Sequence, residues 1–244
     1  MQVVVDGKLV DYVAEGSTGK PVVLFLHGWK SSSKLWVPLM RKISAEGFYC
    51  VAMDFPSVDA VWKVDDFTKF VTDFLRKIRL DGKIFAAVGH SFGGRVMLKD
   101  DFGASRLIFI DSAGIKPHAS FLPFGFLRKI AVRVGKVFLP RSVRRKFASA
   151  DYASLKTENE RETFKNIINE DLSANLDLVK KPTLILWGAR DFDTPVSDAR
   201  IFAKKIAGSE LVVFPNAGHY SFIDEPAETA RLAIDFLGGV CYDE

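Results

Sequence analysis

Cysteine, histidine and long apolar runs are scarce in this chain. Two of its 244 residues are cysteine, Cys50 and Cys241, and four are histidine, and neither type is grouped at the spacing of a metal site. No apolar run approaches the ~20 residues needed to span a bilayer, and the first residues lack the charged and apolar regions of a signal peptide. We therefore expect a cytoplasmic protein with free thiols, no metal and no integral membrane association.

Acidic residues are missing from one long segment. Between residues 116 and 150 there are nine lysines or arginines and no aspartate or glutamate, so this one segment carries the basic excess behind the net charge of +4. The rest of the composition, with 48% hydrophobic and 26% charged residues, is that of a globular domain. No nucleic-acid-binding motif accompanies the basic stretch, and we expect no nucleic-acid partner.

Apolar runs rich in β-forming residues alternate with helical patterns. The runs at residues 2–6 and 9–14 predict an antiparallel hairpin that turns at Asp6-Gly7. Continuously apolar runs follow at 21–28, 48–54, 83–90, 106–114, 182–188 and 210–215, which is typical of parallel strands covered on both faces. Helical patterns lie between them at 33–46, 64–79, 93–100, 196–207 and 226–237. The alternation predicts an α/β fold, a mostly parallel twisted sheet flanked by helices.

The alternation stops between two of the expected strands. Residues 115–181 contain no convincing strand, but helical spacing recurs at 127–138 and again after Thr157, which has capping-box spacing to Glu160. We interpret 115–181 as a helical cap inserted into a core domain of residues 1–114 and 182–244. Such a cap is expected over the carboxyl edge of the sheet, where open α/β sheets bind ligands.

The segment 89–93 reads Gly-His-Ser-Phe-Gly and lies where a strand pattern becomes a helix pattern. This G-x-S-x-G motif is typical of a tight turn that presents a nucleophilic serine, and the glycines around Ser91 suit a turn in which larger side chains would collide. A serine hydroxyl needs a neighbouring base to act as a nucleophile at neutral pH. We therefore interpret Ser91 as a candidate nucleophile.

Four histidines are available as that base. His219 lies in a loop after the last strand pattern and is the predicted base. His90 belongs to the turn itself and should point away from Ser91. His27 ends an early strand and is interpreted as structural, while His118 lies at the start of the cap.

The base needs a carboxylate that holds its tautomer, and the reaction needs hydrogen-bond donors for the oxyanion. Asp191 and Asp193 follow one strand pattern and Asp111 ends another, so the residues leave three candidates for the acid. The backbone N–H groups of Phe92 and Trp29 are the predicted oxyanion donors.

Six short stretches of the sequence belong together: "HGW" at 27–29, "DFP" at 54–56, "GHSFGG" at 89–94, "DSAGI" at 111–115, "WGARDFDTP" at 187–195 and "GHYSFIDEP" at 218–226. With these stretches the chain resembles the α/β-hydrolase superfamily, in its branch of capped serine esterases. The resemblance runs from about Val22 to Leu237. It implies an α/β-hydrolase fold and places the acid on Asp191, three residues after the tryptophan-glycine pair and four before Pro195. The stretch after the nucleophile is shorter than the family's usual helix.

The predicted function is a cofactor-independent serine hydrolase that cleaves carboxylic esters of small or medium acyl chain. Enzymes that share the machinery cleave lactones or C–C bonds, and receptors exist on the same fold, so these remain alternatives. Superfamily members with an aspartate nucleophile, the haloalkane dehalogenases and epoxide hydrolases, are disfavoured by Ser91.

Aromatic and basic side chains of the cap suggest how substrate is bound. An apolar acyl pocket is predicted from Phe121, Phe124, Phe126 and Leu127. Alternatively, the cluster of Arg141, Arg144, Arg145 and Lys146 attracts an anionic substrate or an anionic lipid surface.

Overall fold

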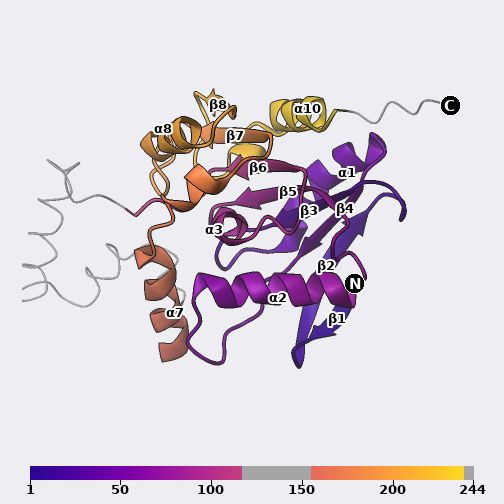
Figure 1. The fold of residues 1–244 in the computed structure, drawn as a ribbon, viewed down its shortest axis with the longest axis vertical. Helices are drawn as coiled ribbons and strands as arrows, with labels where there is room; N and C mark the ends of the chain where they lie inside the picture. Colours follow the sequence, from indigo (N-terminus) through magenta and orange to yellow (C-terminus); the bar gives the residue numbers. More distant parts are fainter. Residues whose placement is uncertain (117–154, 239–244) are drawn as a thin grey trace, which may run out of the picture.

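A computed structural model describes residues 1–116 and 155–238 of the chain (Figure 1). Its centre is an eight-stranded sheet with the order β1-β2-β4-β3-β5-β6-β7-β8. The strands are β1 Gln2–Val5, β2 Lys8–Glu15, β3 Val22–Leu26, β4 Tyr49–Met53, β5 Ile84–His90, β6 Arg106–Ile110, β7 Thr183–Gly188 and β8 Glu210–Phe214. Strands β3 to β8 run parallel, and β1 and β2 pair antiparallel at one edge. This is the predicted α/β-hydrolase fold.

The predicted hairpin forms at the expected turn. Val5 pairs with Lys8 across a two-residue loop, and both loop residues have positive φ, 46° at Asp6 and 73° at Gly7. Two positive φ values match the turn to the right-handed twist of the strands, which explains aspartate-glycine here.

The parallel strands are buried on both faces by helices. In β3, Val22, Leu24 and Leu26 belong to one hydrophobic core, and Val23 and Phe25 belong to the other. The first core also contains side chains of α2 Val64–Lys77, α3 Phe92–Lys99 and α8 Val196–Lys205. The second contains side chains of α1 Val37–Ala45, α9 Ser221–Asp224 and α10 Pro226–Leu237. This two-sided covering explains why the strand segments are continuously apolar.

The helix expected over 33–46 is divided into two pieces. Residues Ser33–Trp36 form a 3₁₀ turn, η1, and the α-helix α1 begins at Val37. Pro38 lies in the first turn of α1, where its missing N–H leaves no hydrogen bond unmade.

The helix expected after Thr157 is α7, Glu158–Asn169, and it is followed by a 3₁₀ turn, η2, at Asn175–Leu178. The Thr157 hydroxyl accepts a hydrogen bond from the Glu160 N–H at 3.2 Å, and the Glu160 side chain accepts one from the Thr157 N–H at 3.3 Å, so the capping box is confirmed. Figure 1 shows α7 beside the chain that leads into α2, where Trp62 N–H donates to the Thr163 hydroxyl at 2.9 Å.

Among the described residues, no helix has both the length and the apolar character needed to cross a bilayer. Cys50 is a buried free thiol, and burial, aided by the charge of Glu15, raises its pKa to about 12, which leaves it unreactive at neutral pH. Cys241 lies outside the described residues.

Candidate active site

The carboxyl ends of five parallel strands bring the predicted site residues to one edge of the sheet. Strand β3 leads into His27–Trp29, β5 into Ser91, β6 into Asp111, β7 into Asp191 and β8 into His219. A parallel sheet turns separate stretches of sequence into one cluster in this way because all its strands end at the same edge.

Ser91 stands in a strained turn between β5 and α3. Its φ and ψ are 50° and −111°, angles that residues with a side chain rarely adopt. A Cβ added to Gly93 would lie 2.1 Å from the Leu26 carbonyl oxygen, and one added to Gly89 would lie 2.5 Å from the Met97 sulfur. The glycines are therefore required by close packing, as the sequence predicted. The Ser91 hydroxyl makes no hydrogen bond to any described residue.

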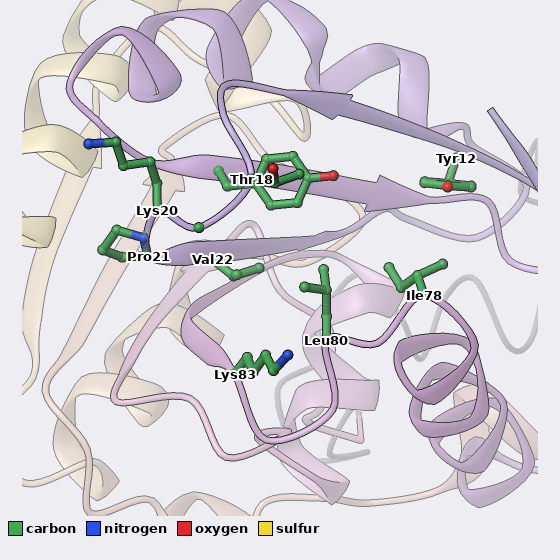
Figure 2. A pocket seen from close by; sticks show the side chains of 10 residues that line it. Tyr12, Thr18, Lys20, Pro21, Val22, Ile78, Leu80 and Lys83 are labelled. Atoms are coloured by element: carbon green, nitrogen blue, oxygen red, sulfur yellow. The ribbon is translucent and has the colours of Figure 1, made fainter.

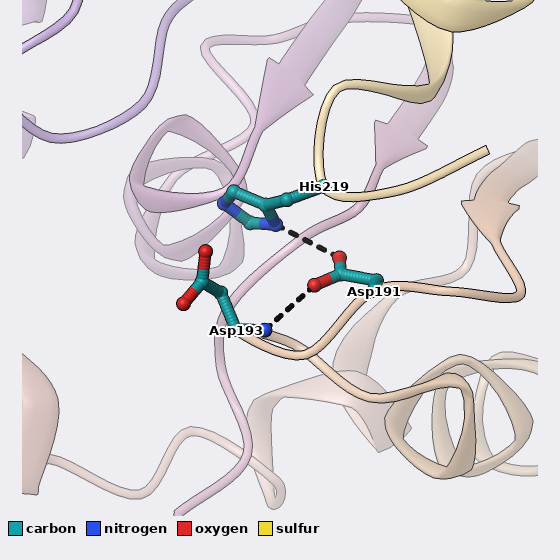
Figure 3. Close-up of side chains that lie close together, drawn as sticks. All are labelled: Asp191, Asp193 and His219. Atoms are coloured by element: carbon teal, nitrogen blue, oxygen red, sulfur yellow. Dashed lines mark hydrogen bonds and ion pairs between the residues drawn. The ribbon is translucent and has the colours of Figure 1, made fainter. Parts of the chain in front are cut away.

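His219 and Asp191 form a hydrogen-bonded pair (Figure 3). The His219 Nδ1 lies 2.8 Å from the Asp191 Oδ2, and the Asp191 side chain is fully buried. Burial acts to lower the pKa of His219, but its hydrogen bond to Asp191 and the charges of Asp191, Asp193 and Asp111 outweigh burial and raise that pKa. The carboxylate therefore stabilises the imidazolium, as a general base at this position requires.

The loop around Asp191 holds its carboxylate in place. Oδ1 accepts hydrogen bonds from the N–H groups of Asp193 at 2.8 Å and Thr194 at 2.9 Å, while Oδ2 accepts one from the Thr194 hydroxyl at 2.6 Å. Burial acts to raise the pKa of Asp191, but its hydrogen bonds with His219 and Thr194 outweigh burial, so the pKa lies below its usual value. Thr194 is a residue that the sequence reasoning missed, although it stands directly before the proline that marks this loop.

The two other candidate acids are placed differently. Asp111 is buried, and its two oxygens accept hydrogen bonds from the N–H groups of Gly188 and Ser221, both at 2.8 Å. Burial raises the pKa of Asp111 to about 6. Asp193 is exposed and lies near His219 without a hydrogen bond to it (Figure 3). Of the three aspartates, Asp191 is the one hydrogen-bonded to His219.

His90 connects the turn of Ser91 to the loop of His219. Burial, reinforced by the charge of His219, lowers the pKa of His90 to about 3, so its ring is neutral. Its Nε2–H donates to the His219 carbonyl oxygen over 2.7 Å. The side chain next to the candidate nucleophile thus fixes the loop of the candidate base.

The turn after β3 lies against Ser91. A Cβ added to Gly28 would be 3.3 Å from the Ser91 Cβ, so glycine permits this approach. Neither the Trp29 N–H nor the Phe92 N–H donates a hydrogen bond to a described residue, which leaves both free for a ligand. The rings of Trp29 and Phe92 pack edge to face with centroids 5.5 Å apart.

His27 holds this turn in place through hydrogen bonds to nearby backbone. Its Nδ1–H donates to the Gly28 carbonyl oxygen at 2.7 Å, and its Nε2 accepts from the Phe55 N–H at 3.0 Å. Burial lowers the pKa of His27. The structural interpretation of this histidine is confirmed, because both ring nitrogens are occupied by nearby backbone.

Asp191, Asp193 and His219 can each bring one ligand atom within 4.8 Å of the others, as a metal site would require. The Asp191 carboxylate, however, already takes part in four hydrogen bonds, which is about its capacity. A cation there would have to compete with His219 for Asp191.

A groove of about 640 Å³ lies at the opposite, amino edge of the sheet, between the starts of β3 and β4 and the end of α2 (Figure 2). It contains none of the predicted site residues. A smaller cavity of about 220 Å³ lies beside the turn after β3, and its lining includes Trp29, Lys30 and Phe67. The cap residues predicted to bind substrate, together with His118 and the basic cluster, fall outside the described residues.

The alpha/beta hydrolase family profile matches residues 23–232, and the chain belongs to this family. It is 27% identical over 268 residues to mouse monoacylglycerol lipase ABHD6, covering 94% of this chain and 79% of that protein. It is 26% identical over 251 residues to the 2-hydroxy-6-oxo-6-(2'-aminophenyl)hexa-2,4-dienoic acid hydrolase of Metapseudomonas resinovorans, covering 91% and 86%. The structure of a bacterial membrane phospholipase A superposes with a TM-score of 0.76 at 23% identity, covering 98% and 85%. The family profile and the two sequence relatives support a hydrolase, and the phospholipase structure shows the same fold.

Proposed function

We propose that this protein is a serine hydrolase that cleaves carboxylic esters of small or medium acyl chain through an acyl-enzyme intermediate. The observation that carries the proposal is the hydrogen bond between His219 and the buried Asp191 carboxylate, at the edge of the sheet on which Ser91 stands in its strained turn. The similarity to a monoacylglycerol lipase, itself an ester hydrolase by name, points to the same chemistry.

In the proposed reaction the Ser91 hydroxyl attacks the ester carbonyl carbon while His219 Nε2 takes its proton. Asp191 keeps Nδ1 protonated and stabilises the imidazolium. The N–H groups of Trp29 and Phe92 donate to the oxyanion, and each such donor contributes roughly 10²–10³ in turnover. The alcohol leaves with the proton from His219. Water, deprotonated by the same histidine, then releases the acid from Ser91.

The test is hydrolysis of p-nitrophenyl acetate, butyrate and octanoate, together with fluorophosphonate labelling, by wild type and Ser91→Ala. We expect turnover and labelling to vanish together in the variant. Ester turnover that persists in Ser91→Ala would refute the mechanism. A preference for a long-chain ester, p-nitrophenyl palmitate, over all three of these esters would refute the proposed acyl length.

A second candidate is hydrolysis of a C–C bond next to a ketone, or of a lactone, by the same residues. The similarity to the dienoic acid hydrolase favours it. Fluorophosphonate labelling of Ser91 without turnover of any simple ester is the result that would select this candidate over the first.

A further inference from the structure

The turn that carries Trp29 is held from outside the core by helix α7. Lys30, directly after Trp29, forms an ion pair between its Nζ and the Glu160 Oε1. Glu160 lies in the first turn of α7 and is only 7% exposed. Its other oxygen accepts hydrogen bonds from the N–H groups of Lys156 at 2.7 Å and Thr157 at 3.3 Å. A residue 130 positions away in sequence thus fixes the side chain next to the predicted oxyanion donor.

The Glu160 carboxylate of this ion pair is ionised at neutral pH. The hydrogen bond from Lys30 holds the pKa of Glu160 at about 2, well below its usual range, against the opposing effect of burial. Removing the ammonium would leave a buried carboxylate without its partner, which is a strongly unfavourable arrangement. The pair therefore fixes where the Lys30 side chain goes.

The backbone of the turn depends on this anchor. Lys30 has a φ of 55°, a left-handed conformation that lysine adopts only when its surroundings impose it. The Ser31 N–H donates to the Gly28 carbonyl oxygen at 3.1 Å and closes the turn around Trp29. The Trp29 ring also contacts α7, with its centroid 5.7 Å from that of Phe164. The side chains of Trp29 and Lys30 therefore both contact helix α7.

We propose that Lys30 and Glu160 are positioning residues that aim the Trp29 N–H at the oxyanion of the reaction. The inference rests on the proposed function, since it concerns the turn assigned there to oxyanion binding. A hydrogen bond that strengthens in the transition state is sensitive to small misplacements of its donor. The ion pair thus affects turnover more than substrate binding.

The experiment compares Lys30→Met, Glu160→Gln and the double variant with wild type. Glu160→Gln keeps the shape of the side chain and an oxygen that can accept from Lys156 N–H. We expect kcat on p-nitrophenyl butyrate to fall about 10- to 100-fold, with KM changing less than about threefold. The fluorophosphonate labelling rate should fall in parallel. The double variant should be no slower than either single one, because the two side chains act as one unit.

Two further variants separate positioning from support of the helix. Thr157→Ala removes the cap of α7 but leaves Lys30 and Glu160 in contact, so it should lower the melting temperature and keep kcat within about twofold. Lys30→Arg, which keeps the charge, should recover most of the lost kcat. Wild-type kcat in folded Lys30→Met, or an equal loss of kcat in Thr157→Ala, would overturn the inference. If the wild type is labelled normally and the variants are labelled as fast as the wild type, the inference alone is refuted. If the wild type is neither labelled nor hydrolyses an ester, the proposed function is refuted as well.

Discussion

Replacing Ser91 by glycine should make the protein more stable than replacing it by alanine. Ser91 has a φ of 50° and a ψ of −111°, and any residue with a Cβ is strained in this conformation. Glycine adopts positive φ without that strain. Both variants lack the hydroxyl, so the comparison isolates the backbone from the chemistry of the side chain.

The size of the difference follows from two opposing effects. Backbone strain of this kind costs about 1–3 kcal/mol, and glycine relieves it. Glycine also makes the unfolded chain more flexible, which costs about 0.4–1 kcal/mol relative to alanine. The net expectation is that Ser91→Gly is the more stable by about 1 kcal/mol, or about 2–4 °C in melting temperature for a chain of this size.

Urea unfolding followed by fluorescence, together with calorimetry, measures this difference. The control is the same pair of substitutions at Ser44, which lies in the last turn of the α-helix α1, where glycine should be the less stable by up to about 1 kcal/mol. Opposite signs at the two positions support strain at Ser91. A Ser91→Gly protein less stable than Ser91→Ala would refute the claim that the turn is strained in the native state.

Three further outcomes are expected. Asp191→Asn should reduce ester turnover by about 10⁴-fold because His219 loses the group that fixes its tautomer, whereas Asp193→Asn should reduce it less than about tenfold; equal losses measured by steady-state kinetics would contradict the assignment of the acid. Because the base must be neutral and the pKa of His219 is raised above 6.5, kcat/KM should fall as pH is lowered, with the loss beginning above pH 6.5; a flat profile between about pH 8 and about pH 5 would argue against His219. Gly93→Ala, whose Cβ would lie 2.1 Å from the Leu26 carbonyl oxygen, should destabilise the protein by about 1–3 kcal/mol in urea unfolding, and an unchanged midpoint would show that the turn can relax.

The fold could be predicted from the sequence because local and global signals agree. Continuous apolar runs such as Val22–Leu26 are required by burial on both faces, and the Asp6-Gly7 pair is required by the hairpin turn. The division of the helix expected over 33–46 into η1 and α1 was not predicted, although Pro38 is a signal for a helix start. Boundaries of this kind depend on a single missing N–H rather than on periodicity.

The candidate site was predictable only in part. Periodicity places Asp111, Asp191 and Asp193 at strand ends and does not choose among them, whereas the family resemblance placed the acid on Asp191, the aspartate that is hydrogen-bonded to His219. In physical terms the choice depends on hydrogen bonds, since both oxygens of Asp111 are taken by backbone N–H groups. The Lys30–Glu160 pair was missed entirely, because a lysine in a loop and a glutamate at N3 of a helix each have an ordinary local explanation. Only the packing of α7 on the turn after β3 brings them together.

Three of the six non-glycine residues with positive φ in the described part of the chain lie at this edge of the sheet. Lys30, Ser91 and Asp111 follow β3, β5 and β6, and all three have positive φ, between 44° and 55°. Glycine would adopt these angles freely, but it would lack the side chain that each position uses. Lys30 supplies the ammonium that pairs with Glu160, Ser91 supplies a hydroxyl, and Asp111 supplies the carboxylate that accepts from backbone N–H groups at the end of β7 and the start of α9. Each strained backbone therefore needs fixed contacts around it, such as the hydrogen bond from the Ala113 N–H to the Ser91 carbonyl oxygen at 3.0 Å. At these three positions a side chain that must point away from the strand end is accompanied by a strained backbone and by fixed hydrogen bonds around it.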